Sequence, residues 1–425
     1  MANVTVAAMR RACLTASSLV LGASVVACTN DDDTPPPTTD AVTTTSTSSP
    51  PDSDGQLTIG FLLPRAENSA LAEGVNGAAR LAVDQINEAG GVLGRRVRAA
   101  AADEGASSAD TQRGYQQLAD AGVDAVIGPT SSLTALSDLD TITGDGVLVC
   151  SPTASALALD DFPDDGMFFR TVPSDSLQAV AIAELAERTG AQDASIVYVD
   201  DAYGRGLAEA VTKALTARAI DVSQTAVAPA EENLTAEALS LLAAEGDVAI
   251  VLGDAVRGPR LLAAMGVAIR GDPELTVPDV IVNDAMRQPE SPELMRDLPG
   301  VLRTMLKGVS PMATPTLDSE PAGLFGTNAY DCVTLIALAA EQAQSDRPVD
   351  IAAAMQGASS GGSVCRRYET CRDLIAAGRN IDYEGPGGVL ELDENGDPSR
   401  ARFDVFAFDV DGVDESVQQL IVSRD

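Results

Sequence analysis

The sequence contains no histidine and no tryptophan, and aromatic residues make up only 3% of its 425 residues. Without histidine, the chain lacks the usual general base of a serine hydrolase and a common nitrogen ligand of zinc sites. Only two lysines occur, Lys213 and Lys307. The core must be built from Ala, Val, Leu and Ile, and the apolar share of 45% is typical of a globular protein.

Basic residues are scarce relative to acidic ones, with 28 Lys and Arg against 63 Asp and Glu and a formal net charge of −35 at pH 7. So much negative charge repels the phosphates of nucleic acids and anionic lipid surfaces. We therefore expect no nucleic acid partner, and we interpret the acidic excess as an aid to solubility. The length is sufficient for two domains.

The N-terminus has the pattern of a targeting segment. Arg10 and Arg11 precede an apolar stretch, residues 12–27, that is too short to span a bilayer as a helix. The stretch ends in VVAC, which resembles a bacterial lipobox, so we expect residues 1–27 to be a signal peptide and Cys28 to be lipidated. The alternative is an ordinary small-residue cleavage site with an incidental cysteine.

Residues 28–55 are dominated by Pro, Thr, Ser and Asp and cannot form a packed core. Together with the lipobox, this composition predicts a disordered tether between a membrane anchor and a folded domain. The protein is thus expected to be exported and attached by its lipid to the outer face of the cell membrane.

Four further cysteines remain after the leader and Cys28, an even number that fits an oxidising compartment. Cys365 and Cys371 are separated by five residues in a glycine-rich stretch, and we predict that they form a disulfide. Cys150 and Cys332 could then pair by elimination.

Short apolar strands alternate with amphipathic helices from residue 56 onward, and the rhythm restarts near residue 172. Such alternation favours parallel sheets with helical crossovers, so the fold class is α/β with two Rossmann-like lobes. We expect strands at residues 57–64, 123–128, 147–150, 194–199, 247–253 and 280–284, and helices at 68–89, 133–143, 177–188 and 206–216. The tail GVLELDENGDPSRARFDVFAFDVDG is predicted to form a strand, a polar turn and a second strand.

A series of segments in fixed order resembles the type I periplasmic binding proteins, particularly the branched-chain amino acid (Leu/Ile/Val) receptors of ABC transporters. The segments are IGFLLP, GVNGAARLAVDQINEAGGVLGRRV, VDAVIGPTSS, VLVCSPTAS, VYVDDAYGRGLAEA and NAYDCVTLIALA. The resemblance implies two lobes joined by three crossovers, with the ligand between them. It places residues 56–172 and 309–385 in the first lobe, and residues 173–308 and 386–425 in the second. The crossovers near 171–174, 306–311 and 385–388 are expected to act as a hinge.

Two hydroxyl-rich segments follow neighbouring strands, Gly128–Ser132 and Ser151–Ser155. In open α/β sheets, ligands bind outside the carboxyl ends of the strands. The resemblance implies that Ser131 or Ser132 holds a ligand carboxylate and that Ala154 and Ser155 add backbone and hydroxyl contacts. The alternative is a pair of hydroxyl-capped helices with no ligand.

The resemblance also assigns Tyr203 to the cleft from the second lobe and Asp284 to the ligand ammonium. A surface tyrosine and a helix N-cap are the respective alternatives. The aromatic residue that the family carries in its first loop is missing, because RAENSALAEG contains none, and residues 253–256 stand where relatives have tyrosines. These departures put a branched-chain ligand in doubt.

Two local motifs could indicate other functions. Gly357–Gly361 matches the G-x-S-x-G pattern of hydrolases, but it follows a predicted helix instead of a strand. Residues 393–397 offer oxygen ligands of the kind that calcium prefers, but Pro398 breaks the EF-hand pattern.

We therefore expect a monomeric solute-binding protein, not an enzyme, with no metal or cofactor. It would capture a small ligand, such as an amino acid, and deliver it to the permease of an ABC transporter. The alternative is a lipid-anchored sensor that presents the same cleft to a membrane receptor.

Overall fold

The computed structural model describes residues 53–65, 69–243, 246–254, 256–287, 292–311, 316–317 and 320–424. The expected signal peptide, Cys28 and most of the expected tether lie outside these residues. Among the described residues, no helix combines the length and the apolar character that a membrane crossing requires.

The first sheet has five parallel strands in the order β2-β1-β3-β4-β5. They are β1 (Thr58–Leu63), β2 (Arg98–Asp103), β3 (Ala125–Ile127), β4 (Leu148–Ser151) and β5 (Phe168–Arg170). Successive side chains of a strand point to opposite faces. In β1, Phe61 and Leu63 therefore join one hydrophobic core, whereas Leu62 joins the other. Both faces of this sheet are buried.

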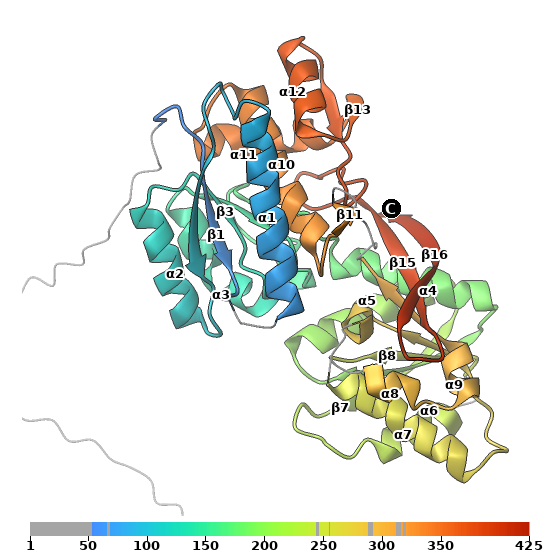
Figure 1. Cartoon of the computed structure of the whole chain (residues 1–425). Helices are drawn as coiled ribbons and strands as arrows, with labels where there is room; N and C mark the ends of the chain where they lie inside the picture. The colour runs from blue at the N-terminus through green and yellow to red at the C-terminus, as the bar shows by residue number, and fades with distance from the viewer. Residues whose placement is uncertain are drawn as a thin grey trace, which may run out of the picture. The chain divides into compact units, whose positions relative to one another are not determined.

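Helices cover the two faces of the first sheet (Figure 1). One face carries α1 (Ala70–Glu88), α10 (Gly326–Ala343), α11 (Pro348–Ser359) and α12 (Tyr368–Ala376), and the other carries α2 (Ser108–Asp120) and α3 (Ser132–Gly144). A short sheet of β13 (Ser363–Cys365) and β14 (Ile381–Tyr383) lies next to α12 in sequence. The helix α1 begins at Ser69, whose hydroxyl accepts the Ala72 N–H, as helix N-caps commonly do.

The second sheet has seven strands in the order β16-β15-β10-β9-β8-β6-β7. They are β6 (Asp193–Val199), β7 (Asp221–Val227), β8 (Val248–Leu252), β9 (Asp279–Val282), β10 (Leu306–Ser310), β15 (Arg400–Phe408) and β16 (Asp414–Ser423). Strands β6 to β10 are parallel, whereas β15 runs antiparallel to both β10 and β16. Parallel pairs dominate, and an antiparallel hairpin closes one edge.

Helices also cover both faces of the second sheet. The helices α4 (Asp175–Thr189) and α5 (Ala202–Thr216) pack on one face. The other face carries α6 (Thr235–Ala243), α7 (Arg257–Gly271), α8 (Pro292–Arg296) and α9 (Gly300–Met305). The short elements are η1 (Leu157–Leu159), η2 (Asp284–Arg287), β11 (Thr316–Leu317) and β12 (Glu320–Pro321).

The chain passes three times between the two sheets: from β5 to α4, from β10 to α10, and from β14 to β15. The first two passages are paired side by side, because the Asn328 amide donates to the Thr171 carbonyl and the Thr171 hydroxyl donates to the Asn328 carbonyl. This topology confirms the predicted α/β class with two Rossmann-like lobes and three crossovers.

The second strand predicted in the tail is confirmed as β15, whereas the first is wrong. Residues 388–393 form no strand and make only two isolated bridges, Gly385 with Gly388 and Leu392 with Pro398, and the hairpin consists of β15 and β16 around a turn at residues 409–413. The apolar residues Leu390 and Leu392 pack in the core of the first sheet instead. The backbone of a buried apolar segment can form its hydrogen bonds in a loop as well as in a β-strand. Hydrophobicity alone therefore did not show whether this segment is a loop or a strand.

The four cysteines lie in the two pairs that the sequence analysis named. Cys150, in β4, is bonded to Cys332 in α10, with Cα atoms 5.8 Å apart. Cys365, in β13, is bonded to Cys371 in α12, with Cα atoms 5.4 Å apart. Both bonds lie within the core of the first sheet.

Candidate functional site

A cavity of about 350 Å³ lies among helices that pack on different sheets. Small-molecule sites typically occupy roughly 300–1,000 Å³. Its lining consists of Ser131, Ser132, Leu133, Leu136, Ala156, Leu157, Ala158, Asp175, Ala202, Tyr203 and Gly206. The first seven of these come from α3 and the loop after β4, and the last four come from α4 and α5. The lining is mainly aliphatic, and none of its described residues is Lys or Arg.

The two serines at the start of α3 face this cavity with their hydroxyl protons available. The Ser131 oxygen accepts the Thr134 N–H as the N-cap of α3, and the Ser132 oxygen accepts the Ala156 N–H at 3.2 Å. A hydroxyl that accepts in this way can still donate its own proton. Both serines can therefore donate to an acceptor of a ligand, as the resemblance implied for a carboxylate.

The backbone N–H groups before α3 already have an internal anion as a partner. The buried Glu104 carboxylate accepts the Thr130 N–H at 2.9 Å, the Thr130 hydroxyl at 2.6 Å and the Ser131 N–H at 3.0 Å. Burial raises the pKa of Glu104, and the hydrogen bonds from Thr130 and Ser131 oppose that rise. A ligand carboxylate would have to rely on hydroxyls here, because these N–H groups are occupied.

Ala154 and Ser155 occupy different environments. Ala154 is fully buried, its N–H donates to the Ser151 hydroxyl, and it does not line the cavity. Ser155 borders the polar end of the site: its carbonyl accepts the Asp175 N–H at 2.9 Å, and its hydroxyl interacts with both Asp175 and Tyr203. Contact of either residue with a ligand stays a prediction.

Tyr203 and Asp284 lie close together on the second lobe's side of the site. Tyr203 lines the cavity from the first turn of α5, whereas Asp284 begins η2 directly after β9 and accepts a hydrogen bond from Gln178 at 2.9 Å. Burial raises the pKa of Asp284, against the effect of Gln178. Burial also raises the pKa of Tyr203, and the neighbouring charges of Asp175 and Asp284 raise it further.

Asp175 is an acidic residue of the cavity lining that the sequence analysis missed, whereas Asp284 is not among the described lining residues and lies next to Asp175 and Tyr203. Asp175 is 3% exposed, and within the described part of the chain its Oδ2 atom has no hydrogen-bond partner. Burial raises its pKa well above the ordinary value, and the adjacent Asp284 carboxylate adds to the effect. The sequence did offer a signal, since an acid in the first turn of a helix that starts just after a strand lies at the ligand-binding edge of an α/β sheet.

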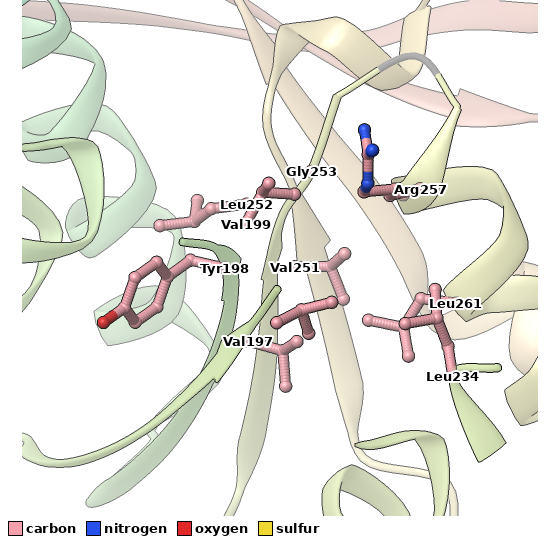
Figure 2. Close-up of a pocket in the computed structure, with 11 residues that line it drawn as sticks. Val197, Tyr198, Val199, Leu234, Val251, Leu252, Gly253, Arg257 and Leu261 are labelled. Atoms are coloured by element: carbon pink, nitrogen blue, oxygen red, sulfur yellow. The ribbon is translucent and has the colours of Figure 1, made fainter. Parts of the chain in front are cut away.

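A smaller cavity of about 10 Å³ lies inside the second lobe, between β6, β8 and α7 (Figure 2). Aliphatic side chains such as Val197, Val251 and Leu261 form most of its wall, with Arg257 at its margin. A volume of roughly 10–15 Å³ is needed to hold one water molecule. This cavity is too small for a metabolite.

The two rival motifs have structural roles. Ser359 of the G-x-S-x-G pattern is fully buried at the end of α11, where its hydroxyl donates to the Gln356 carbonyl and accepts the Leu392 N–H. Asp393 accepts the N–H groups of Asn395 and Asp397 in a tight turn. In the described ranges, no group of three or more His, Cys, Asp or Glu residues is arranged to hold a metal ion.

Comparison with known proteins gives the family. A family model described as "Periplasmic binding protein" matches residues 56–268, and one described as "Receptor family ligand binding region" matches residues 311–411. The chemotactic signal transduction system substrate-binding protein of Halobacterium salinarum is 27% identical over 362 residues, which cover 79% of this chain and 83% of that protein. The leucine-, isoleucine-, valine-, threonine- and alanine-binding protein of Pseudomonas aeruginosa is 25% identical over 355 residues, which cover 80% and 86%.

Solved structures support the same fold. An ABC transporter substrate-binding protein from Desulfitobacterium hafniense, in complex with Leu, aligns with a TM-score of 0.66 and 22% identity over 85% of this chain and all of that one. The first family match alone spans half of the 425 residues. The chain therefore belongs to the periplasmic binding protein family, as a type I member that resembles the branched-chain amino acid-binding proteins of ABC transporters.

Proposed function

We propose that this protein is an extracytoplasmic solute-binding protein that captures an amino acid in the 350 Å³ cavity and delivers it to the permease of an ABC transporter. The observation that carries the proposal is the division of polar groups across the cavity. The hydroxyls of Ser131 and Ser132 lie on one side and the acids Asp175 and Asp284 lie near the other. A zwitterion requires such a division, because its two charges need different partners when water is expelled.

The acidic pair supports an ammonium group as part of the ligand. The charge of Asp284 raises the pKa of Asp175, and among the described residues the buried Oδ2 atom of Asp175 has no hydrogen-bond partner. A ligand cation between them would satisfy that oxygen and offset their repulsion. The aliphatic lining near α3 and η1 favours an apolar ligand side chain. The printed names of the relatives, which include binders of leucine, isoleucine and valine, support the same ligand class.

The experiment is a binding titration of the mature protein with the twenty standard amino acids by calorimetry, followed by the same titration of Asp284→Asn. We expect at least one aliphatic amino acid to bind. The substitution keeps the shape and removes the charge, so it should weaken binding by about 2–5 kcal/mol, well over tenfold.

The matched control is Asp279→Asn, at the opposite end of the same strand, which should leave the affinity unchanged. An unaltered affinity in Asp284→Asn would remove the assignment of the ammonium to Asp284 and leave Asp175 as its partner. If Asp175→Asn also binds as tightly as wild type, a neutral or anionic ligand becomes the better proposal.

A sensor that presents the ligand to a membrane receptor is the second candidate. The relative in Halobacterium salinarum bears the name of a chemotactic signal transduction protein, which favours this alternative specifically. Reconstitution of the protein with its cognate transporter decides between delivery and sensing. Ligand-dependent ATP hydrolysis by the transporter supports delivery. No such hydrolysis, although the protein binds its ligand, supports sensing.

The anchor and the lobe boundaries belong to the same proposal. Cys28 is proposed to carry the lipid after removal of residues 1–27, with residues 28–55 as the tether. The lobes are proposed to be residues 56–172 with 309–385, and 173–308 with 386–425, and the protein to act as a monomer without enzymatic activity. Mass spectrometry of the native protein should find a diacylglyceryl group on Cys28 at the mature N-terminus.

A further inference from the structure

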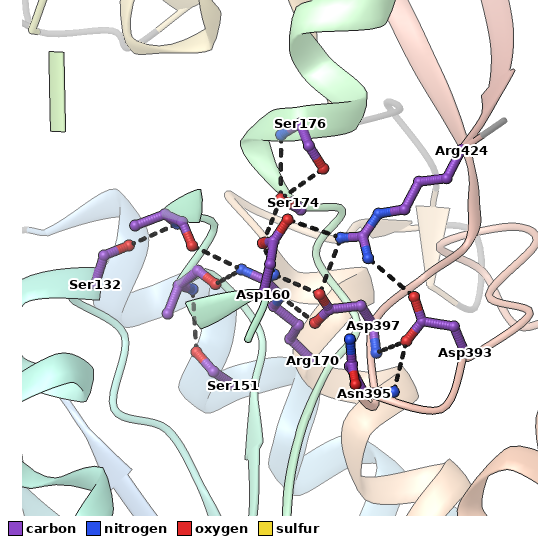
Figure 3. Close-up of polar contacts among 12 residues, drawn as sticks. Ser132, Ser151, Asp160, Arg170, Ser174, Ser176, Asp393, Asn395, Asp397 and Arg424 are labelled. Carbon is purple, nitrogen blue, oxygen red and sulfur yellow. Dashed lines mark hydrogen bonds and ion pairs between the residues drawn. The ribbon is translucent and has the colours of Figure 1, made fainter. Parts of the chain in front are cut away.

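A buried ionic network lies beside the candidate site (Figure 3). At its centre is Arg170, at the end of β5, whose side chain is 0% exposed. Its guanidinium binds Asp397 through two nitrogens, at 2.5 and 2.6 Å, and it also binds Asp160. The side chain of Asp397 is likewise fully buried. Two-point guanidinium–carboxylate pairs of this kind fix the geometry of both partners.

A second arginine reaches the same carboxylates from the end of the chain. Arg424 follows β16 and donates to Asp160 at 3.1 Å, to Asp397 at 2.9 Å and to Asp393 at 2.9 Å. The two guanidinium groups thus share two carboxylates, Asp160 and Asp397, and Arg424 also binds Asp393. Since β16 belongs to the second sheet and Leu392 packs in the core of the first, Arg424 spans the third passage between the sheets.

The network is joined to the cavity by direct hydrogen bonds. The remaining nitrogen of Arg170 donates to the carbonyls of Ala154 and Ala156, each at 3.2 Å, and Ala156 lines the cavity. Asp160 accepts the hydroxyl of Ser174, which is the N-cap of α4, at 2.7 Å. The helix α4 carries Asp175 in its first turn. Both walls of the cavity are therefore attached to the same ionic cluster.

We propose that Arg170 and Arg424 are positioning residues of the ligand site. Through Asp160 and Asp397, the two arginines hold the loop Ala154–Leu157 against the start of α4. The segment around Arg424 thereby sets the geometry of the cavity. This inference rests on the proposed function for its ligand, but the coupling itself is a property of the ligand-free protein. Neither arginine needs to touch the ligand.

The test is hydrogen–deuterium exchange of the full mature protein, without ligand, in wild type and Arg424→Gln. The side chain of Arg424 is 27% exposed. In this variant Asp160 and Asp397 still pair with Arg170, so the fold should survive. We expect the amides of Ala156, Leu159 and Asp160 to exchange roughly 2- to 30-fold faster, the range typical of mutations that couple to a site at a distance. The amides of β8 should be unchanged, because a purely global loss of stability would accelerate them as well.

The second measurement is the affinity for L-leucine, which should weaken over the same 2- to 30-fold range in Arg424→Gln. Arg424→Lys, which keeps the charge, should recover part of the loss. The control is Arg400→Gln, at the neighbouring end of β15, whose side chain pairs with Glu391 and not with the network.

Unchanged exchange at residues 154–160 in Arg424→Gln overturns the proposal, as does an equal increase in β8. If wild type fails to bind L-leucine, leucine is not the ligand, and the exchange data alone decide the positioning role. Arg170→Lys provides a second variant, for which the same local acceleration is expected and uniform exchange throughout the chain counts against the proposal.

Discussion

At the scale of single residues, Asp331 shows how a buried acid can make stability depend on pH. It lies in α10 with no exposed surface and accepts the Tyr383 hydroxyl and the Gly387 N–H, each at 2.8 Å. Burial raises its pKa from the ordinary value of 3.8 to about 7, although both hydrogen bonds oppose that rise. Between those pH values the folded protein keeps a proton that the unfolded chain has released.

The sign of the pH dependence follows from that raised pKa. The contribution of Asp331 to stability is complete below about pH 3.8 and is lost as the pH rises through about 7. We predict that the free energy of unfolding of wild type falls more steeply between about pH 4 and pH 7 than that of Asp331→Asn, by up to about 1.4 kcal/mol per pH unit. Urea denaturation at several pH values measures the two slopes.

The control for this prediction is Asp373→Asn, in α12, whose side chain is 65% exposed. Its unfolding free energy should follow the wild-type profile. If Asp331→Asn shows the same slope as wild type, Asp331 is ionised in the folded protein throughout this range and the assigned shift is wrong.

At the scale of helices and strands, the sequence predicted best where the hydrophobic pattern is strong. The stripe of Val75, Ala79, Ala82 and Ile86 predicted a helix over residues 68–89, and the structure has α1 at Ala70–Glu88 with those residues buried. The strand β2 was missed, because its sequence RAAAAD lacks the β-branched residues that mark a strand. Its strand form comes from pairing with β1, a long-range effect that local sequence does not encode.

The same limit applies to the candidate site. The resemblance led to Ser131, Ser132 and Tyr203, which line the cavity together. It did not lead to Asp175 or to Glu104. The Glu104 carboxylate accepts hydrogen bonds from Thr130 and Ser131, which are 26 and 27 residues further along the sequence. An acid that serves an internal loop and one that faces a ligand look alike in a sequence. Only the neighbours that the fold brings to each carboxylate distinguish them.

The two disulfides allow a prediction about the elements that they join. The Cys150–Cys332 bond closes a loop with a sequence separation of 182, and the Cys365–Cys371 bond one with a separation of 6. If constraint of the unfolded chain dominates, the larger loop contributes about 5 kcal/mol and the smaller about 2 kcal/mol. Replacing Cys150 and Cys332 by Ala should therefore cost more than the same change at Cys365 and Cys371.

Urea denaturation of both double variants measures this order, and peptide mapping without reductant verifies the pairs. A larger loss for the Cys365 and Cys371 variant would show that local packing of β13 against α12 outweighs the loop entropy. Free thiols at Cys365 and Cys371 in the native protein would contradict the pairing itself.

At the scale of the whole molecule, charge limits what the cavity can accept. The chain carries a formal net charge of −35, and the described lining of the cavity includes Asp175 but no basic side chain. Arg170 lies close by, yet its nitrogens are engaged by Asp160, Asp397 and two carbonyls. If this cavity binds the ligand, as proposed, an anionic ligand should meet repulsion and a few hydroxyls, and the site should discriminate by repulsion as well as by attraction.

Ligand binding is expected to change the arrangement of the two lobes as well as the occupancy of the cavity. The lining comes from α3 and the loop near η1 on the one hand, and from α4 and α5 on the other. A zwitterion satisfies both of its charges only when hydroxyls and acids approach it together, so binding energy favours closure over the open state. We propose that closure bends the chain where it passes from β5 to α4, from β10 to α10 and from β14 to β15. The second hinge expected from the sequence, at residues 306–311, was placed too early, because Leu306–Ser310 form strand β10.

We predict that small-angle scattering of the mature protein gives a smaller radius of gyration at saturating L-leucine than without ligand. Asp284→Asn should show no such decrease at the same ligand concentration, because the ammonium then lacks its partner and closure loses its driving force. Asp279→Asn should contract like wild type. An unchanged radius in wild type that calorimetry shows to be saturated would mean that the lobes are already closed before the ligand binds, and that the ligand enters through local motion of the cavity wall.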